Sequence, residues 1–182
     1  MKRLVLILLC ALLALPFGCA GEKSGGAPAA ETPADRPDAA AETGGTVGDL
    51  SFDTVTLYGE PISAEIVKGY DLVIVNYWAE WCGPCVGELP ELQRIHEEYP
   101  NVLILGVLTG TDGVDLAKAT LERAGVTYPT LEPSGSLIAM SRRSQYIPAT
   151  YFFNGDGVEI GSEVIGAQDY EGWKATVEGL LP

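Results

Sequence analysis

The most informative segment of the chain reads LVIVNYWAEWCGPC and covers residues 72–85. Its first part, Leu72–Trp78, is apolar and rich in β-branched and aromatic side chains, which predicts a buried strand. A helix is predicted over residues 83–99, because apolar side chains recur there at three- and four-residue steps. Cys82 and Cys85 therefore lie at the point where the strand gives way to the helix.

A second apolar run, Val102–Leu108, follows the predicted helix. Strand, helix and strand of these lengths form a βαβ unit, whose two strands are expected to be parallel neighbours. The fold class is therefore α/β. The next expected element is a helix at 112–124, capped by Thr111 or Asp112 and ended by Gly125. After it we expect a strand at 127–131, a helix at 134–143, a strand at Ala149–Phe153 with a hairpin partner at 158–165, and a helix at 168–181.

The composition allows one folded domain with additional segments and argues against several partners. The chain has 182 residues, of which 47 % are hydrophobic, so a packed core can form. Its formal net charge is -14, from 25 acidic and 11 basic side chains. Phosphate contacts need clustered Lys and Arg, so nucleic acid is not expected as a partner. Adhesion to anionic lipid through charge is disfavoured for the same reason.

The N-terminus has the pattern of an export signal. Lys2 and Arg3 precede an apolar run at residues 4–15, which is shorter than the roughly 20 residues of a membrane-spanning helix. We therefore predict a signal peptide at residues 1–18. The alternative is a buried N-terminal helix, which the low-complexity segment that follows disfavours.

The residues before Cys19 resemble the lipobox of bacterial lipoproteins, in which cleavage leaves the cysteine as a lipidated first residue. Gly18 fits the small residue expected before the cysteine, whereas Pro16 and Phe17 depart from the pattern. Lipidation of Cys19 would also account for the odd cysteine that cleavage leaves in an exported chain. Simple secretion and an uncleaved anchor are the alternatives.

Residues 19–48 are predicted to be a lipid-anchored flexible linker, and residues 49–182 the folded domain. Positions 22–48 are rich in Ala, Gly, Pro, Glu and Thr and have almost no large apolar side chain. Such a segment cannot bury enough surface to offset its ordering entropy. A coil of about thirty residues has a root-mean-square span of roughly 30 Å, which lets the domain reach partners away from a membrane.

Several kinds of site use paired cysteines. A zinc site needs about four soft or imidazole ligands, and His96 is the only histidine, so no metal is expected. Covalent haem attachment requires a histidine where the chain has Val86. A structural disulfide between Cys82 and Cys85 would close too small a loop to restrict the unfolded chain much.

Redox chemistry gives each position a physical role. Cys82 falls at a helix N-terminus, where unpaired N–H groups and the helix dipole favour a thiolate. Cys85 lies one turn further along the same side, within reach to resolve a mixed disulfide. Pro84 is tolerated in the first turn, where it removes no intrahelical hydrogen bond. The sulfurs carry the electrons themselves, so no cofactor is expected.

Residues 75–85, with Trp-Ala-Glu-Trp-Cys-Gly-Pro-Cys at their end, resemble the active-site strand and loop of the thioredoxins. The lipobox and a later insertion are more similar to the extracytoplasmic TlpA/ResA-like proteins. The resemblance covers about residues 48–182 and implies a thioredoxin-like fold with a central mixed β-sheet flanked by helices. It implies that Cys82 attacks and Cys85 resolves, with Ile147 and Pro148 in a cis-proline loop facing them. The Gly83-Pro84 dipeptide is that of reducing thioredoxins.

The chain departs from this pattern at Asn76, where thioredoxins carry a buried aspartate proposed to accept a proton from the second cysteine. Glu88 is the candidate replacement, because it lies one turn beyond Cys85 and its Glu-x-Pro context is similar to that of TlpA/ResA-like proteins. The alternatives are that water accepts the proton and that Glu88 is a solvated helix residue. At least one of Trp78 and Trp81 is expected in the core, and Trp81 also at the docking surface.

The resemblance implies a thiol–disulfide oxidoreductase that reduces exported proteins such as apocytochrome c, with electrons from a membrane thiol transporter. We expect a monomer on the extracytoplasmic (periplasmic) side, held to the membrane by the lipid at Cys19. Two rivals stay open. One is a thioredoxin-like binding module with an inert dithiol. The other is a peroxiredoxin-like peroxidase. Its Pro-x-x-x-Thr-x-x-Cys motif is absent, because the chain has Val75 where the motif requires Pro and Ala79 where it requires Thr.

Overall fold

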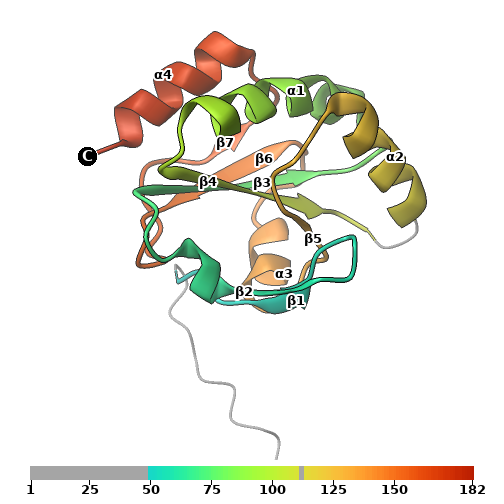
Figure 1. Cartoon of the computed structure of the whole chain (residues 1–182), viewed down its shortest axis with the longest axis horizontal. Coiled ribbons are helices and arrows are strands. Elements are labelled where there is room, and N and C mark those ends of the chain that lie inside the picture. The colour runs from blue at the N-terminus through green and yellow to red at the C-terminus, as the bar shows by residue number, and fades with distance from the viewer. Residues whose placement is uncertain (1–48, 111–112) are drawn as a thin grey trace, which may run out of the picture. The chain divides into compact units, whose positions relative to one another are not determined.

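A five-stranded sheet organises the computed structural model, which describes residues 49–110 and 113–182 (Figure 1). The predicted signal peptide, Cys19 and the linker lie outside these residues. The sheet has the order β5-β4-β3-β6-β7, with the strands Thr130–Leu131, Val102–Leu108, Leu72–Trp78, Ala149–Phe153 and Val164–Ile165.

The two central strands lie as the βαβ pattern predicts. β3 and β4 are parallel neighbours, and β3 pairs antiparallel with β6 on its other side, so the sheet is mixed and the α/β class is confirmed. Every residue of β3 and β4 is buried, because both faces of the sheet are covered. Fully burying one such aliphatic side chain contributes roughly 1.5–3 kcal/mol.

Helices cover one face of the sheet. α1 (Gly83–Glu98) lies between α2 (Val114–Ala124) and α4 (Tyr170–Leu180) on this face (Figure 1). The apolar stripe of α1, which includes Leu92 and Ile95, packs in one cluster with Leu72 and Ile74 of β3. The periodicity that predicted α1 therefore marks the face that holds it on the sheet.

The other face is covered by smaller elements. They are the hairpin of β1 (Asp53–Val55) and β2 (Pro61–Ser63), the 3-10 helix η1 (Ala64–Val67) and the short helix α3 (Ser136–Ser141), as Figure 1 shows. The alternate β3 residues Val73, Val75 and Tyr77 pack in a core cluster on this side. No helix in residues 49–110 and 113–182 is long and apolar enough to cross a membrane.

The hairpin partner predicted over 158–165 is present only in part. Residues 158–160 pair with the end of β6 through the bridge of Phe153 to Glu159 and two backbone hydrogen bonds, and β7 pairs antiparallel with the start of β6, so the hairpin is interrupted between these two parts. Val158 bridges to Asp49, so this part of the chain pairs with the N-terminal segment. Gly161 has φ +66, a left-handed conformation that interrupts an extended strand.

Candidate active site

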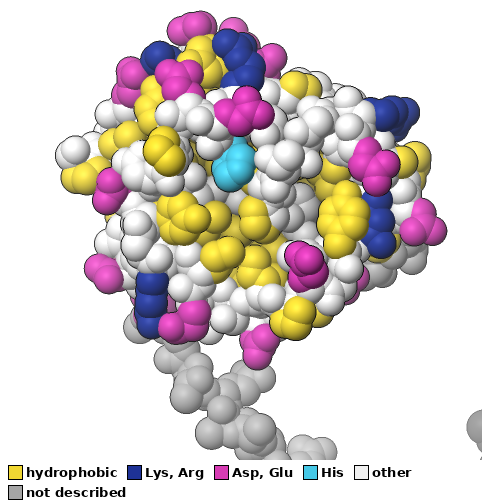
Figure 2. Space-filling view, viewed as in Figure 1, with side chains coloured by type: hydrophobic (Ala, Val, Ile, Leu, Met, Phe, Trp, Pro, Cys, Tyr) yellow, Lys and Arg dark blue, Asp and Glu magenta, His cyan; other side chains and the backbone are white. Residues whose placement is uncertain are grey.

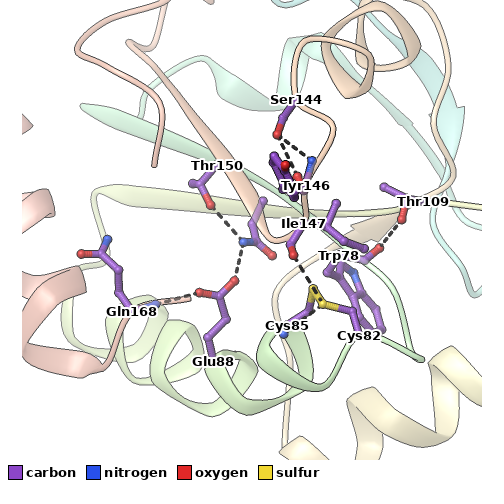
Figure 3. Close-up of a disulfide and its surroundings, with 11 residues drawn as sticks. Trp78, Cys82, Cys85, Glu88, Thr109, Ser144, Tyr146, Ile147, Thr150 and Gln168 are labelled. Atoms are coloured by element: carbon purple, nitrogen blue, oxygen red, sulfur yellow. Dashed lines mark hydrogen bonds between the residues drawn. A yellow bond between two sulfur atoms is a disulfide. The ribbon is translucent and has the colours of Figure 1, made fainter. Parts of the chain in front are cut away.

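Cys82 and Cys85 are joined by a disulfide at the start of α1 (Figure 3). β3 ends at Trp78, the chain turns, and Cys82 is the N-cap residue of the helix. The backbone N–H of Cys85 donates a hydrogen bond to Sγ of Cys82 at 3.3 Å. Pro84 stands in the first turn, where its missing N–H removes no intrahelical bond. The helix N-terminus and this donor both favour negative charge on Sγ of Cys82.

The two sulfur positions differ in access. Cys82 is 6 % exposed, whereas Cys85 is fully buried. Trp78 is fully buried in the same core cluster, while Trp81 is 70 % exposed next to Cys82. The expectation that at least one of these tryptophans belongs to the core is therefore confirmed. A sulfur arriving from solvent meets Cys82 first.

The Ile147–Pro148 peptide bond is cis and lies against the disulfide, as the resemblance implies. β6 starts directly after Pro148, and its first residue, Ala149, pairs with Tyr77 near the end of β3. This register brings the carbonyl oxygen of Ile147 to 3.7 Å from Sγ of Cys82 (Figure 3). None of the hydrogen bonds among the described residues uses the N–H of Ile147. That group is available to an incoming chain.

Glu88 is buried under the sheet, one helical turn beyond Cys85, so its interpretation as a solvated residue is wrong. Its Oε1 accepts a hydrogen bond from Nδ2 of Asn76 at 2.9 Å, and its Oε2 accepts one from the backbone N–H of Gln168 at 3.2 Å. Nδ2 of Asn76 also donates to Oγ1 of Thr150 at 3.0 Å. Figure 3 shows the Glu88 side chain directed from α1 with its carboxylate next to the backbone of Gln168.

Burial raises the pKa of Glu88 to about 7, because the loss of solvation outweighs the hydrogen bonds that stabilise its charge. A carboxyl group with this pKa can both accept and release a proton near neutral pH. Asn76 occupies the position of the buried thioredoxin aspartate, and its amide group donates a hydrogen bond to the carboxyl group of Glu88. The sequence did not indicate Thr150 or Gln168 as partners, because they are 74 and 80 residues away from the groups they bind.

Arg143 anchors the segment that leads into the cis-proline loop. Its two terminal nitrogens donate to both carboxylate oxygens of Glu159, at 2.7 and 2.8 Å. Its guanidinium also lies 4.5 Å from the ring centroid of Tyr151. Arg142, next to it in the chain, is exposed like Arg143. Among the described residues only Arg143 of the two forms an ion pair, so only Arg143 links the loop to the β6–β7 connection.

Residues 49–110 and 113–182 contain no group of three or more His, Cys, Asp and Glu side chains that could hold a metal ion. His96 lies further along α1, half-buried, with its ring 6.0 Å from that of Tyr128 in an edge-on arrangement. This histidine therefore packs away from the disulfide.

The family model described as the AhpC/TSA family matches residues 44–158. The chain belongs to the AhpC/TSA family. Among curated relatives of this AhpC/TSA protein, the thiol-disulfide oxidoreductase ResA of Bacillus anthracis is 24 % identical over 72 % of this chain and 76 % of its own length. ResA of Oceanobacillus iheyensis is 27 % identical over 75 % of this chain and 73 % of its own length.

Solved structures agree with this assignment. A thiol:disulfide interchange protein from Chlorobium tepidum has a TM-score of 0.66 at 23 % identity, covering 74 % of this chain and 96 % of that structure. A secreted Mycobacterium tuberculosis disulfide oxidoreductase has a TM-score of 0.62 at 24 % identity, covering 72 % and 97 %. This AhpC/TSA protein therefore has the thioredoxin-like fold, and its predicted similarity to ResA-like proteins is confirmed.

Proposed function

We propose that this thiol–disulfide oxidoreductase reduces disulfides of exported proteins, apocytochrome c among them, with Cys82 and Cys85 as its catalytic residues. One observation carries the proposal. The cysteine pair lies at the N-terminus of α1, with only the Cys82 sulfur near the surface and the backbone of Ile147 beside it; among the described residues the N–H of Ile147 has no hydrogen-bond partner. This arrangement supplies an activated nucleophile, a resolving thiol and a backbone group for substrate docking.

The reaction starts from the dithiol form. The Cys82 thiolate attacks one sulfur of the substrate disulfide, that S–S bond breaks, and the first substrate thiolate leaves and takes up a proton from water. Cys85 then loses its proton and attacks Sγ of Cys82, which releases the second substrate thiolate. Two electrons pass from the dithiol to the substrate, and the product is the Cys82–Cys85 disulfide present in the structure.

Glu88 accepts the proton that Cys85 loses in this scheme. It is buried one turn beyond Cys85 on the same helix, and its pKa of about 7 matches a base that works near neutral pH. Asn76 positions it by donating to Oε1. The carboxyl group then passes the proton on when a membrane thiol transporter reduces the disulfide again.

Substrate docking uses the edge formed by the cis-proline loop. An extended segment next to the substrate disulfide pairs with the N–H of Ile147, as in strand addition, and brings its sulfur to Cys82. Pro148 leads directly into β6 and so fixes this backbone next to Cys82. Trp81, exposed on the other side of Cys82, adds an aromatic contact.

The protein works outside the cytoplasm in this proposal, as a monomer on a lipid anchor. Support comes from the export pattern at residues 1–18, the lipobox-like cysteine Cys19 and the linker composition of residues 19–48. Export, as distinct from the anchor, is also supported by a relative in Mycobacterium tuberculosis that is 26 % identical over 59 % of this chain and is named a soluble secreted antigen, MPT53. Labelling of the full chain with radioactive palmitate, in cells producing either the native protein or Cys19→Ala, tests the anchor.

The midpoint potential of the cysteine pair tests the direction of the reaction. We expect a value near the roughly -270 mV of thioredoxin, measured by equilibration with thiol redox buffers. A value near the roughly -120 mV of DsbA would reverse the direction.

Insulin reduction followed by turbidity tests the activity itself. No reduction would favour an inert binding module, and efficient consumption of hydrogen peroxide would favour the peroxidase.

A further inference from the structure

A cavity of about 700 Å³ opens beside Trp81, the residue that precedes Cys82. Its wall comes from the loop after β3, from the residues that follow β4 and from the start of α2. The side chains in this wall include Glu80, Trp81, Val114, Asp115 and Leu116. The cavity therefore lies beside the residue that precedes the nucleophile, on the side of α2, whereas the docking edge at Ile147 leads into β6.

The apolar part of the wall is unusually open to solvent. Trp81 is 70 % exposed and Leu116 is 56 % exposed, and Val114 is half-buried beside them. Large apolar side chains gathered around a hollow next to a reactive sulfur indicate contact with another molecule. An indole face is also a favourable surface for a cation.

The polar part of the wall is acidic and has no cation of its own. Among the described residues, neither Glu80 nor Asp115 takes part in an ion pair or a side-chain hydrogen bond. The carboxylate of Glu80 lies directly against Gly113, since a Cβ at position 113 would be 2.0 Å from its Oε1. The absence of a side chain at Gly113 therefore leaves room for this carboxylate at the cavity wall.

We propose that this cavity binds an Arg or Lys side chain of the substrate, located within a few residues of the cysteine that Cys82 attacks; this rests on the proposed function. The aliphatic stem lies on Val114 and Leu116, the charged end lies over Trp81, and the carboxylates of Glu80 and Asp115 pair with it. An acidic side chain is repelled, and an apolar one leaves both carboxylates without a partner. The cavity thus selects exported polypeptides with a basic residue next to their disulfide.

Three peptides test this inference. They share one sequence with a single cysteine, held in a mixed disulfide with thionitrobenzoate, and differ only in one neighbouring residue, which is Lys, norleucine or Glu. The rate at which the reduced full-length protein releases thionitrobenzoate is measured for each. We expect the Lys peptide to react roughly tenfold faster than the norleucine peptide, and the Glu peptide to react slowest.

Matched variants separate the cavity from the general acidity of the protein. Asp and Glu side chains are spread over the face seen in Figure 2, with few Lys and Arg among them, so any basic peptide feels some attraction. Glu80→Gln should lower the Lys-to-norleucine rate ratio several-fold, to the level that Asp115 and the general acidity of the protein maintain. Gly113→Ala should lower it as well, because its methyl group displaces the Glu80 carboxylate without changing the charge. Glu171→Gln, an exposed residue of α4, removes the same charge and should leave the ratio unchanged.

The outcomes distinguish this inference from the function on which it rests. Reduction of the norleucine peptide without any preference for Lys overturns the inference and leaves the oxidoreductase intact. A ratio that Glu171→Gln lowers as much as Glu80→Gln also overturns it, because the preference then comes from net charge. Failure to reduce any of the peptides overturns both. A preference lowered by Glu80→Gln and Gly113→Ala alone supports the assigned cavity.

Discussion

The sulfur of Cys82 lies 3.7 Å from the carbonyl oxygen of Ile147, although 65 positions separate them in the chain. The antiparallel pairing of β3 with β6 produces this contact, because the two strands meet where β3 ends and β6 begins. In the disulfide the sulfur carries no proton, so the contact is not a hydrogen bond. On reduction the Cys82 thiol can donate to this oxygen, and in the proposed function the substrate approaches along the same edge.

The difference in access between the two sulfurs predicts how serine variants behave. Cys85→Ser should form a stable mixed disulfide between Cys82 and the substrate, because the thiol that resolves it is missing. Cys82→Ser should lower the rate of insulin reduction by about a thousandfold or more, since the buried Cys85 cannot replace the nucleophile. Non-reducing mass spectrometry of both variants after exposure to substrate checks this. A mixed disulfide mapped to Cys85 would contradict the assignment.

The buried carboxyl group predicts an unusual dependence of stability on pH. Burial raises the pKa of Glu88 to about 7 from its ordinary value of 4.5. Between these values the folded protein keeps a proton that the unfolded chain has lost, so stability falls as the pH rises. Relative to Glu88→Gln, the native protein should lose up to about 3 kcal/mol between pH 4.5 and pH 8.

Urea unfolding of the two oxidised proteins at several pH values measures this difference. The comparison uses the change with pH and not the absolute stability, because the Glu88→Gln substitution alters the hydrogen bonds with Asn76 and Gln168 at every pH. The same pH dependence in both proteins would show that Glu88 titrates like an exposed carboxyl group.

The anchoring of the cis-proline loop predicts different outcomes for the two adjacent arginines. Arg143→Ala removes a two-point ion pair with Glu159 and the contact with the Tyr151 ring, and should cost about 1–2 kcal/mol of unfolding free energy. The rate of insulin reduction should fall as well, because the loop ahead of Ile147 loses its ion pair with Glu159. Arg142→Ala is the matched control and should change stability by less than about 0.5 kcal/mol. Equal effects of the two substitutions would argue against the anchor.

The exposure of Trp81 predicts a docking role without a stability role. Trp81→Ala should change the unfolding free energy by less than about 0.5 kcal/mol, because the side chain is 70 % exposed. The rate of reduction should fall about tenfold for insulin and by less for a small disulfide such as cystine. Trp78→Ala, which empties a fully buried position, should instead cost about 3–5 kcal/mol. Parallel losses with insulin and cystine would show that Trp81 acts on the sulfur and not on docking.

The central strands could be predicted because their largely apolar sequence matches their burial on both faces of the sheet. The bounds of β3, β4 and β6 agree with the runs identified from the sequence, since strands buried on both faces are continuously apolar. The hairpin of β1 and β2 was not predicted. Its strands have three residues each and are only partly buried, so they carry no clear alternation. The segment is held instead by tertiary contacts, with Thr56 bridged to Leu131 of β5 and the N–H of Ser136 in α3 bonded to the carbonyl oxygen of Ser51.

The candidate site could be predicted at the level of its motif but not of its surroundings. The spacing of Cys82 and Cys85 is local, and so is the helix that holds them. The environment of Glu88 depends on Asn76 from β3, Thr150 from β6 and the backbone of Gln168, which only the folded sheet brings together. The sequence therefore allowed both a solvated and a buried Glu88, and only tertiary structure distinguishes them.

The complete burial of Cys85 beside a barely exposed Cys82 has a kinetic consequence. Donor and acceptor must react at one sulfur, so they compete for a single position and cannot form a ternary complex. Turnover then follows a ping-pong cycle, in which the donor has left before the acceptor reacts. Double-reciprocal plots of rate against acceptor concentration, taken at several donor concentrations, are therefore expected to be parallel.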